Sequence, residues 1–190
     1  MNKKFNEVVI VGAVRTPIGT YKGIFKDVKA HSLGSAVIKE VLRRVNVLQD
    51  EVDEVIMGQV LTAGSGQNPA RQAAVSANIP ISKPAYLVNQ VCGSGLRAVI
   101  SGYQSIKLGE IKQVITGGQE NMSMAPHSIL SRYGKKISKD ALVDTMIYDG
   151  LIDAFNNYHM GVTAENVAEK WNISREDQDN FSLSSQKKAQ

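Results

Sequence analysis

Over its first 120 residues the chain alternates apolar, strand-like runs with stretches that have helical spacing. Four strands are predicted, at residues 8–14, 54–60, 86–91 and 113–116. The first is a continuous apolar run, which is typical of a strand buried on both faces of a sheet. Strands that alternate with helices favour an α/β domain whose sheet is largely parallel.

The helices between these strands have recognisable starts. Ser32 is predicted to cap a helix whose apolar residues recur at helical spacing to about residue 45. Asn68 followed by Pro69 predicts a cap and a first-turn proline, with a helix running to about residue 78. A third helix is predicted at 93–108, with a glycine in the usual stop position.

The pattern changes after residue 118. Residues 122–140 are expected to form a long loop or excursion that carries a basic cluster over 132–139. Three helices are predicted to follow, at 141–155, from a Thr163 cap to residue 171, and from a Ser174 cap to residue 190. We therefore expect two domains, residues 1–121 and 122–190. The last helix has no stop signal, which leaves open whether the natural polypeptide continues.

Composition is that of an ordinary globular protein. The 190 residues are 43% apolar and 21% charged, which suffices for a sizeable core and disfavours a disordered chain. A single cysteine excludes a disulfide framework, a four-cysteine zinc site and a Cys-x-x-Cys redox pair. No apolar run near the start is long enough to span a membrane or to act as a secretory signal. A cytoplasmic location is therefore expected.

The net charge of +4 is unevenly spread. Residues 1–50 hold nine Lys and Arg against four Asp and Glu, whereas residues 141–190 hold four against eight. The basic residues lie among apolar ones without interleaved aromatics, so nucleic-acid binding is disfavoured. A mildly basic face suits a small phosphorylated ligand or an ordinary solvated surface.

The most informative stretch surrounds the only cysteine, Cys92, in the order Val-Asn-Gln-Val-Cys-Gly-Ser-Gly-Leu. Cys92 falls between a predicted strand and a predicted helix, where unpaired backbone N–H groups and the helix dipole favour a thiolate. Gly93 and Gly95 remove side chains where an acyl group would approach. These features suit a nucleophile in acyl transfer, and a small buried cysteine beneath a helix is the alternative.

A cysteine nucleophile usually needs a base, and the chain offers three histidines. They are His31, before a predicted helix, His127, in the long loop, and His159, before the predicted Thr163 cap. Spacing does not identify any of them as the base. Each also fits the role of a surface or hydrogen-bonded histidine.

Beyond these patterns, the stretch around Cys92 resembles the acyl-enzyme signature of the thiolases, the acetyl-CoA acetyltransferases of biosynthesis in particular. Five further motifs in the family's order extend the resemblance over nearly the whole chain. They are Val-Arg-Thr-Pro-Ile-Gly at 14–19, Gly-Gln-Asn-Pro-Ala-Arg-Gln at 66–72, Gly-Gly-Gln-Glu-Asn-Met-Ser at 117–123, Tyr-His-Met-Gly at 158–161 with Thr-Ala-Glu-Asn at 163–166, and Ser-Arg-Glu-Asp-Gln-Asp at 174–179.

The resemblance implies both a fold and a reaction. The fold is the N-terminal half of the layered α-β-α-β-α thiolase fold, with a mixed, mostly parallel sheet and part of a helical loop domain. The reaction joins two acetyl-CoA molecules into acetoacetyl-CoA plus CoA, or runs in reverse, through an acyl group on Cys92. It also implies that Leu151, His159 and Met160 contact the pantetheine and acyl end. No cofactor is implied, because the CoA thioesters are substrates.

The resemblance also indicates what this chain lacks. Thiolases are roughly twice as long, and their second half supplies a Gly-His-Pro histidine, an asparagine and a second cysteine. This sequence has no second cysteine and no Gly-His-Pro, so we expect the chain to be an N-terminal half that is inactive alone. The family further implies homo-oligomers, dimers or tetramers, in which the excursion at 132–139 takes part in tetramer assembly.

Two other interpretations stay open from sequence. In the first, the chain is a non-catalytic half that pairs with a partner, or a module that binds CoA without turnover. Alternatively it belongs to a related condensing enzyme that uses carrier-protein thioesters. The match of residues 122–179 to the CoA-binding excursion argues against that last interpretation.

Overall fold

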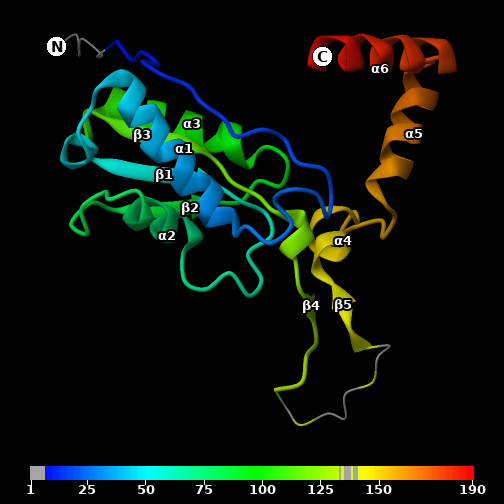
Figure 1. Cartoon of the computed structure of the whole chain (residues 1–190). Coiled ribbons are helices and arrows are strands. Elements are labelled where there is room, and N and C mark those ends of the chain that lie inside the picture. Colours follow the sequence, from blue (N-terminus) through cyan, green and yellow to red (C-terminus); the bar gives the residue numbers. More distant parts are fainter. Residues whose placement is uncertain (1–6, 133, 135–137, 139–140) are drawn as a thin grey trace. The chain divides into compact units, whose positions relative to one another are not determined.

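A computed structural model describes residues 7–132, 134, 138 and 141–190 (Figure 1). The chain divides into two compact units, the first ending at Gly150 and the second comprising Leu151–Gln190. The sequence-based domain boundary between residues 121 and 122 stays a prediction. None of the helices in the described ranges is long and apolar enough to cross a membrane.

The centre of the first unit is a sheet of three parallel strands. These are β1 (Glu54–Gly58), β2 (Ala85–Val88) and β3 (Val114–Gly118), in the order β2-β1-β3. β1 lies in the middle and is buried over four of its five residues, as its apolar sequence predicts. The three strands point the same way, so their carboxyl ends meet at one edge. The predicted α/β domain with a parallel sheet is confirmed.

Three helices pack on this sheet. They are α1 (Ala30–Val45), α2 (Pro69–Ser76) and α3 (Ser94–Leu108). The connection through α2 moves from β1 to β2, and the connection through α3 moves back across β1 to β3. Because parallel crossovers are right-handed, a reversal of direction puts the two connecting helices on opposite faces. Figure 1 shows α1 and α2 on one face of the sheet and α3 on the other.

The main core lies between the sheet and the two helices α1 and α2. Ile38 and Leu42 of α1 meet Val55 and Met57 of β1 there, together with four alanines of and just after α2. The alanines at positions 70, 73, 74 and 77 have no exposed surface, so α2 comes close to both α1 and the sheet. On the opposite face a side chain on Gly102 of α3 would collide with β3, so that helix also packs closely.

The predicted strand at residues 8–14 is wrong for this structure. The run has no strand assignment, and Val9, Ile10 and Val11 are 66%, 80% and 72% exposed. A cavity of about 560 Å³ is lined both by this run and by β3, so the two do not form a hydrogen-bonded ladder. An apolar run becomes a strand only where a neighbouring strand hydrogen-bonds to its backbone groups. β3 is an edge strand of the described sheet and could be that neighbour, but the run is not paired with it.

The predicted Ser32 cap is also wrong. α1 begins at Ala30, with Lys29 in the capping position at φ −58° and ψ 141°, and no side chain caps this end. Ser32 therefore lies within the first turn. By contrast, α2 begins as predicted, with the Asn68 side chain accepting a hydrogen bond from the Arg71 N–H. α3 and its glycine stop at Gly109 are confirmed to within one residue.

The stretch at 122–140 is not only a loop. It holds a short 3₁₀ turn, η2 (Met122–Met124), and the strand β4 (His127–Ser128), which pairs antiparallel with β5 (Val143–Asp144). Lys135, Lys136 and Lys139 of the predicted basic cluster lie outside the described residues. The helix predicted at 141–155 is shorter, α4 (Thr145–Gly150), because the Asp144 carboxylate starts it by accepting from two backbone N–H groups.

The second unit holds two helices, α5 (Met160–Trp171) and α6 (Arg175–Ala189). α6 has the predicted capping box, in which Ser174 and Asp177 each bond to the other's backbone N–H. The predicted Thr163 cap is wrong. α5 starts four residues earlier, because the Nδ1 atom of His159 accepts from the Gly161 N–H in place of a capping oxygen.

Candidate active site

Cys92 lies where the sequence places it, in the turn between β2 and α3, and its side chain is exposed. The turn is tight, with the Gly93 N–H donating to the Gln90 carbonyl at 3.0 Å. Val91, directly before the cysteine, has φ of 48°, in the left-handed region that β-branched residues rarely adopt. The thiol thus sits on a strained strand-to-helix elbow, which lifts it from the end of the sheet.

Ser94 holds this elbow together, a role that sequence reasoning missed. Its hydroxyl donates to the Val91 carbonyl at 2.5 Å and accepts from the Gln90 N–H at 2.9 Å. The residue is 4% exposed, so both bonds are shielded from water. The signal was the serine two positions after the cysteine, at the start of a helix, where hydroxyls commonly satisfy free backbone groups.

The elbow rests directly on the sheet because glycines line the contact. A Cβ on Gly58, the last residue of β1, would lie 2.4 Å from the Ser94 carbonyl carbon and 2.5 Å from the Gly95 nitrogen. A Cβ on Gly118, at the end of β3, would lie 3.5 Å from the Gly95 Cα. Only a residue without a side chain at position 58 lets the first turn of α3 come this close.

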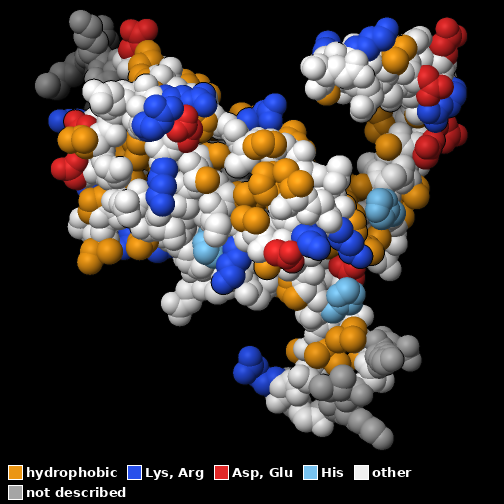
Figure 2. Space-filling model, viewed as in Figure 1, with side chains coloured by type: hydrophobic (Ala, Val, Ile, Leu, Met, Phe, Trp, Pro, Cys, Tyr) orange, Lys and Arg blue, Asp and Glu red, His pale blue; other side chains and the backbone are white. Residues whose placement is uncertain are grey.

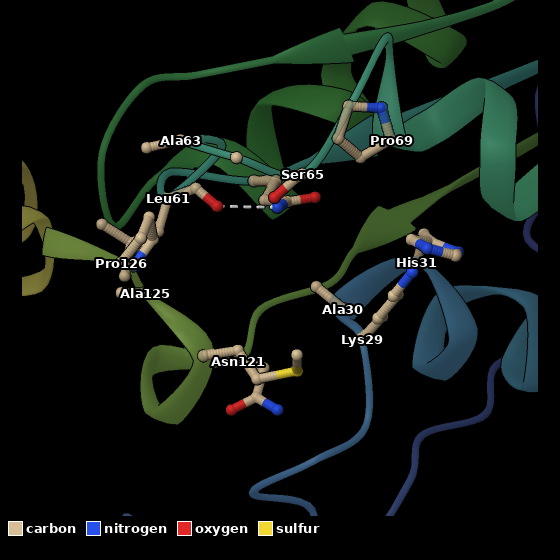
Figure 3. A pocket seen from close by; sticks show the side chains of 13 residues that line it. Lys29, Ala30, His31, Leu61, Ala63, Ser65, Pro69, Asn121, Ala125 and Pro126 are labelled. Atoms are coloured by element: carbon tan, nitrogen blue, oxygen red, sulfur yellow. Dashed lines mark hydrogen bonds between the residues drawn. The ribbon is translucent and has the colours of Figure 1, made fainter. Parts of the chain in front are cut away.

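Beside the elbow, a polar network joins the residues that follow β1 and β3. The buried Gln119 side chain donates from Nε2 to Oε1 of Gln59 at 2.9 Å. Gln59 in turn donates to the Leu61 carbonyl at 2.8 Å, the bond that is dashed in Figure 3. The Glu120 carboxylate accepts from the N–H groups of Val60 at 2.8 Å and Leu61 at 3.3 Å. Burial raises the pKa of Glu120, and these two hydrogen bonds act against that shift.

A small pocket of about 160 Å³ lies by this network, at the start of α1. Figure 3 shows its walls, which come from Lys29, Ala30 and His31, from Leu61, Ala63 and Ser65, and from Asn121, Ala125 and Pro126. Burial, together with the charge of Lys29, lowers the pKa of His31. Its Nδ1 atom is buried without a hydrogen-bond partner among the described residues. His31 is therefore a half-buried neutral histidine at a helix start.

The other first-unit histidine, His127, pairs across the β4–β5 ladder. Its Nε2 atom lies 3.9 Å from the Asp144 carboxylate, and the two residues are register partners. That is the long limit of an ion pair between exposed groups, and such pairs contribute little. His127 is thus a hairpin residue.

The remaining candidates all belong to the second unit, whereas Cys92 belongs to the first. Leu151, His159 and Met160 come together there: the Met160 N–H donates to the Leu151 carbonyl at 2.8 Å, and Ile152 pairs with His159. Leu151 is half-buried, while His159 and Met160 are exposed. Because His159 accepts through Nδ1, the neutral ring carries its proton on Nε2, which is available as a donor.

The described residues contain no group of three or more His, Cys, Asp and Glu side chains arranged to hold a metal ion. The first turn of α3 has no acidic side chain that would oppose an anion beside Cys92. On the C-terminal side of the thiol, Gly93 and Gly95 carry no side chains. Chemically, the arrangement offers one exposed thiol at the start of a helix.

Comparison with known proteins gives a consistent result. The family model described as "Thiolase, N-terminal domain" matches residues 8–190. The chain is 56% identical over 183 residues to an acetyl-CoA acetyltransferase of Rhizobium meliloti, covering 96% of this chain and 47% of that protein. It is 53% identical over 190 residues to the cytosolic acetyl-CoA acetyltransferase of Rattus norvegicus, covering all of this chain and 48% of that one.

A probable acetyl-CoA acyltransferase of Staphylococcus aureus is 52% identical over 183 residues, covering 96% of this chain and 47% of that protein. The chain therefore spans about half the length of the curated relatives that it matches.

Proposed function

Because this chain belongs to the thiolase family, whose N-terminal domain it matches, we propose that it carries the nucleophilic half of an acetyl-CoA acetyltransferase. The single observation that carries the proposal is the exposed Cys92 thiol on a strained elbow between β2 and α3. A cysteine that served only packing would be buried beneath the helix.

The reaction runs in two steps. First, the Cys92 thiolate attacks the carbonyl carbon of acetyl-CoA, the thioester bond breaks, and CoA leaves as a thiolate that takes up a proton. Second, a base, which the second half of the family's longer chains would supply, takes a proton from the methyl group of another acetyl-CoA, and the resulting carbanion attacks the acetyl-cysteine. A carbon–carbon bond forms, Cys92 leaves as the thiolate, and acetoacetyl-CoA is released. The backbone N–H of Cys92 contributes to stabilising the negative oxygen of each tetrahedral intermediate.

The second unit is proposed to bind the CoA end. Leu151 and Met160 offer apolar surface to the pantetheine and acyl chain, and Nε2 of His159 offers a hydrogen-bond donor. Residues 1–121 act as the nucleophile-bearing domain, and residues 122–190 belong to the CoA-binding loop domain. We place the protein in the cytoplasm, by analogy with the relative named as cytosolic. A homo-oligomer is proposed because the family resemblance implies one.

The test is an intact mass of the full chain before and after exposure to acetoacetyl-CoA, followed by peptide mapping. One acetyl group on Cys92 is expected even from a half that does not turn over, because a single attack on the keto carbon releases acetyl-CoA and leaves an acetyl-cysteine. The Cys92→Ser variant is expected to gain none. Acetylation of lysines alone, or acetylation that persists in the variant, would refute the assignment of Cys92.

A second candidate is favoured by one observation. On α3, Leu96 is 68% exposed and Tyr103 is 48% exposed, and Figure 2 shows apolar side chains (orange) at the molecular surface. Such a surface suits a half that binds CoA and acts only with a partner polypeptide. Binding of CoA without acetylation of Cys92, together with self-association in a sedimentation experiment, would favour this second candidate.

A further inference from the structure

The carboxylate of Glu120 lies in an unusual environment for a charged side chain. It is the second residue after β3, it is half-buried, and no basic side chain of the described residues pairs with it. Its carboxylate instead accepts two backbone N–H groups, from Val60 at 2.8 Å and Leu61 at 3.3 Å. Removing a carboxylate from water without a counter-ion is costly, so its retention here calls for a specific role.

The two hydrogen bonds join the end of β3 to the first residues after β1. The same junction is reinforced by the Gln119 N–H, which donates to the Gly58 carbonyl at 2.9 Å. Next along the chain, the Gln59 N–H donates to the Val88 carbonyl at 3.1 Å. The carboxylate therefore fixes a segment that is tied to β3 on one side and to the end of β2 on the other.

That segment begins with the residue on which the elbow rests. Gly58 supports the first turn of α3, where an added Cβ would lie 2.4 Å from Ser94. Ser94 in turn holds Gln90 and Val91, the residues that precede the cysteine. A continuous set of contacts thus leads from the Glu120 carboxylate to the turn that carries the thiol.

We infer that Glu120 is a positioning residue for Cys92, which holds residues 58–61 in place so that the thiol keeps its direction toward the acyl donor. The inference rests on the proposed function for its kinetic consequence. It does not require contact between Glu120 and any substrate.

The variants follow from the geometry. Glu120→Gln keeps the shape, but its amide NH₂ group cannot accept, so one of the two N–H groups loses its partner. Glu120→Asp keeps both acceptor oxygens on a shorter side chain and is expected to restore part of the effect. Glu176→Gln is the control, since Glu176 lies on α6 in the second unit.

The first measurement compares two reactions of Cys92. Acetylation by acetoacetyl-CoA needs the thiol in one direction, and a displacement of about 1 Å lowers such a rate by up to a hundredfold. Alkylation by iodoacetamide, a small reagent, has no such requirement. We expect Glu120→Gln to slow acetylation by about tenfold or more and to change alkylation by less than about twofold, with Glu176→Gln unchanged in both. A general loss of structure would instead speed alkylation, so equal or opposite shifts would overturn the inference.

The second measurement does not depend on the proposed function. Amide hydrogen exchange in Glu120→Gln is expected to rise by about tenfold at Val60 or Leu61, the partners of the carboxylate, and also at Gln90 and Gly93 in the elbow. Faster exchange confined to the first pair would mean that Glu120 stabilises only its own loop, and would overturn the inference. If the wild-type chain is not acetylated, the proposed function fails alone, and the exchange pattern still decides the role of Glu120.

Discussion

Replacing Gly58 by alanine is expected to destabilise the first unit and to misdirect the cysteine elbow. The added Cβ would lie 2.4 Å from the Ser94 carbonyl carbon, 2.5 Å from the Gly95 nitrogen and 2.7 Å from the Ser94 oxygen. Non-bonded carbon atoms prefer separations of about 3.5–4.0 Å. All three opposing atoms are backbone, so no side chain can rotate away, and the start of α3 must move by about 1 Å to restore contact.

Overpacking of this kind costs about 1–3 kcal/mol. With a urea dependence of about 2 kcal/mol/M for a small unit, we expect the unfolding midpoint to fall by about 1 M. Circular dichroism is the suitable signal, because the single tryptophan, Trp171, reports on the second unit. The same displacement is expected to slow acetylation of Cys92 by acetoacetyl-CoA by about tenfold to a hundredfold.

Gly95→Ala is the matched control, since it is the same change on the facing element. Its added Cβ would lie 3.9 Å from the Gly118 Cα, an ordinary contact, and its position in α3 favours alanine by about 0.5–1 kcal/mol. The two variants should therefore shift the midpoint in opposite directions. A Gly58→Ala chain within about 0.2 M of wild type, with unchanged acetylation, would show that the elbow does not rest on Gly58.

Three further substitutions have expected outcomes. Ser94→Ala leaves the Gln90 N–H without its buried partner and should cost about 1–3 kcal/mol in urea unfolding, whereas a change below about 0.5 kcal/mol would mean that water replaces the hydroxyl. Asn68→Ala removes the cap of α2 and should cost about 1 kcal/mol by the same measurement. Asp53→Ala removes the acceptor of two backbone N–H groups and should cost about 1 kcal/mol at neutral pH, discounted because the side chain is about a third exposed. The hydrogen bond from the Lys112 N–H lowers the pKa of Asp53, so this stabilisation is present above pH 3.8, the ordinary value, and is lost as the pH falls through the lowered folded value. A difference between variant and wild type that persists in acid would contradict that reasoning.

Structural features that depend only on a few neighbouring residues could be predicted from the sequence. The Asn68–Pro69 start of α2, the stop of α3 at Gly109 and the Ser174 capping box each need only local hydrogen bonds, and each is found. The placement of Cys92 between a strand and a helix could be predicted for the same reason, because the apolar run and the glycines bracket it directly.

Features that depend on distant partners could not be predicted. The apolar run at 8–14 has the composition of a strand, but its outcome depends on whether β3 accepts its backbone groups. The support of the elbow by Gly58, and the bonds of Glu120 to the loop after β1, join residues separated by about 36 and 60 positions in the chain. The capping role of His159 could not be predicted, because an imidazole rarely replaces a hydroxyl at the start of a helix.

The left-handed backbone conformation of Val91 lowers the stability of the folded chain. A valine at φ of 48° costs on the order of 1–3 kcal/mol, and its side chain is 51% exposed, so burial does not explain its retention. A library selected only for heat resistance should therefore accumulate glycine or asparagine at position 91. A library selected for acetyl transfer should keep a residue that restricts the turn, so sequence diversity at this single position would distinguish which pressure a population had experienced.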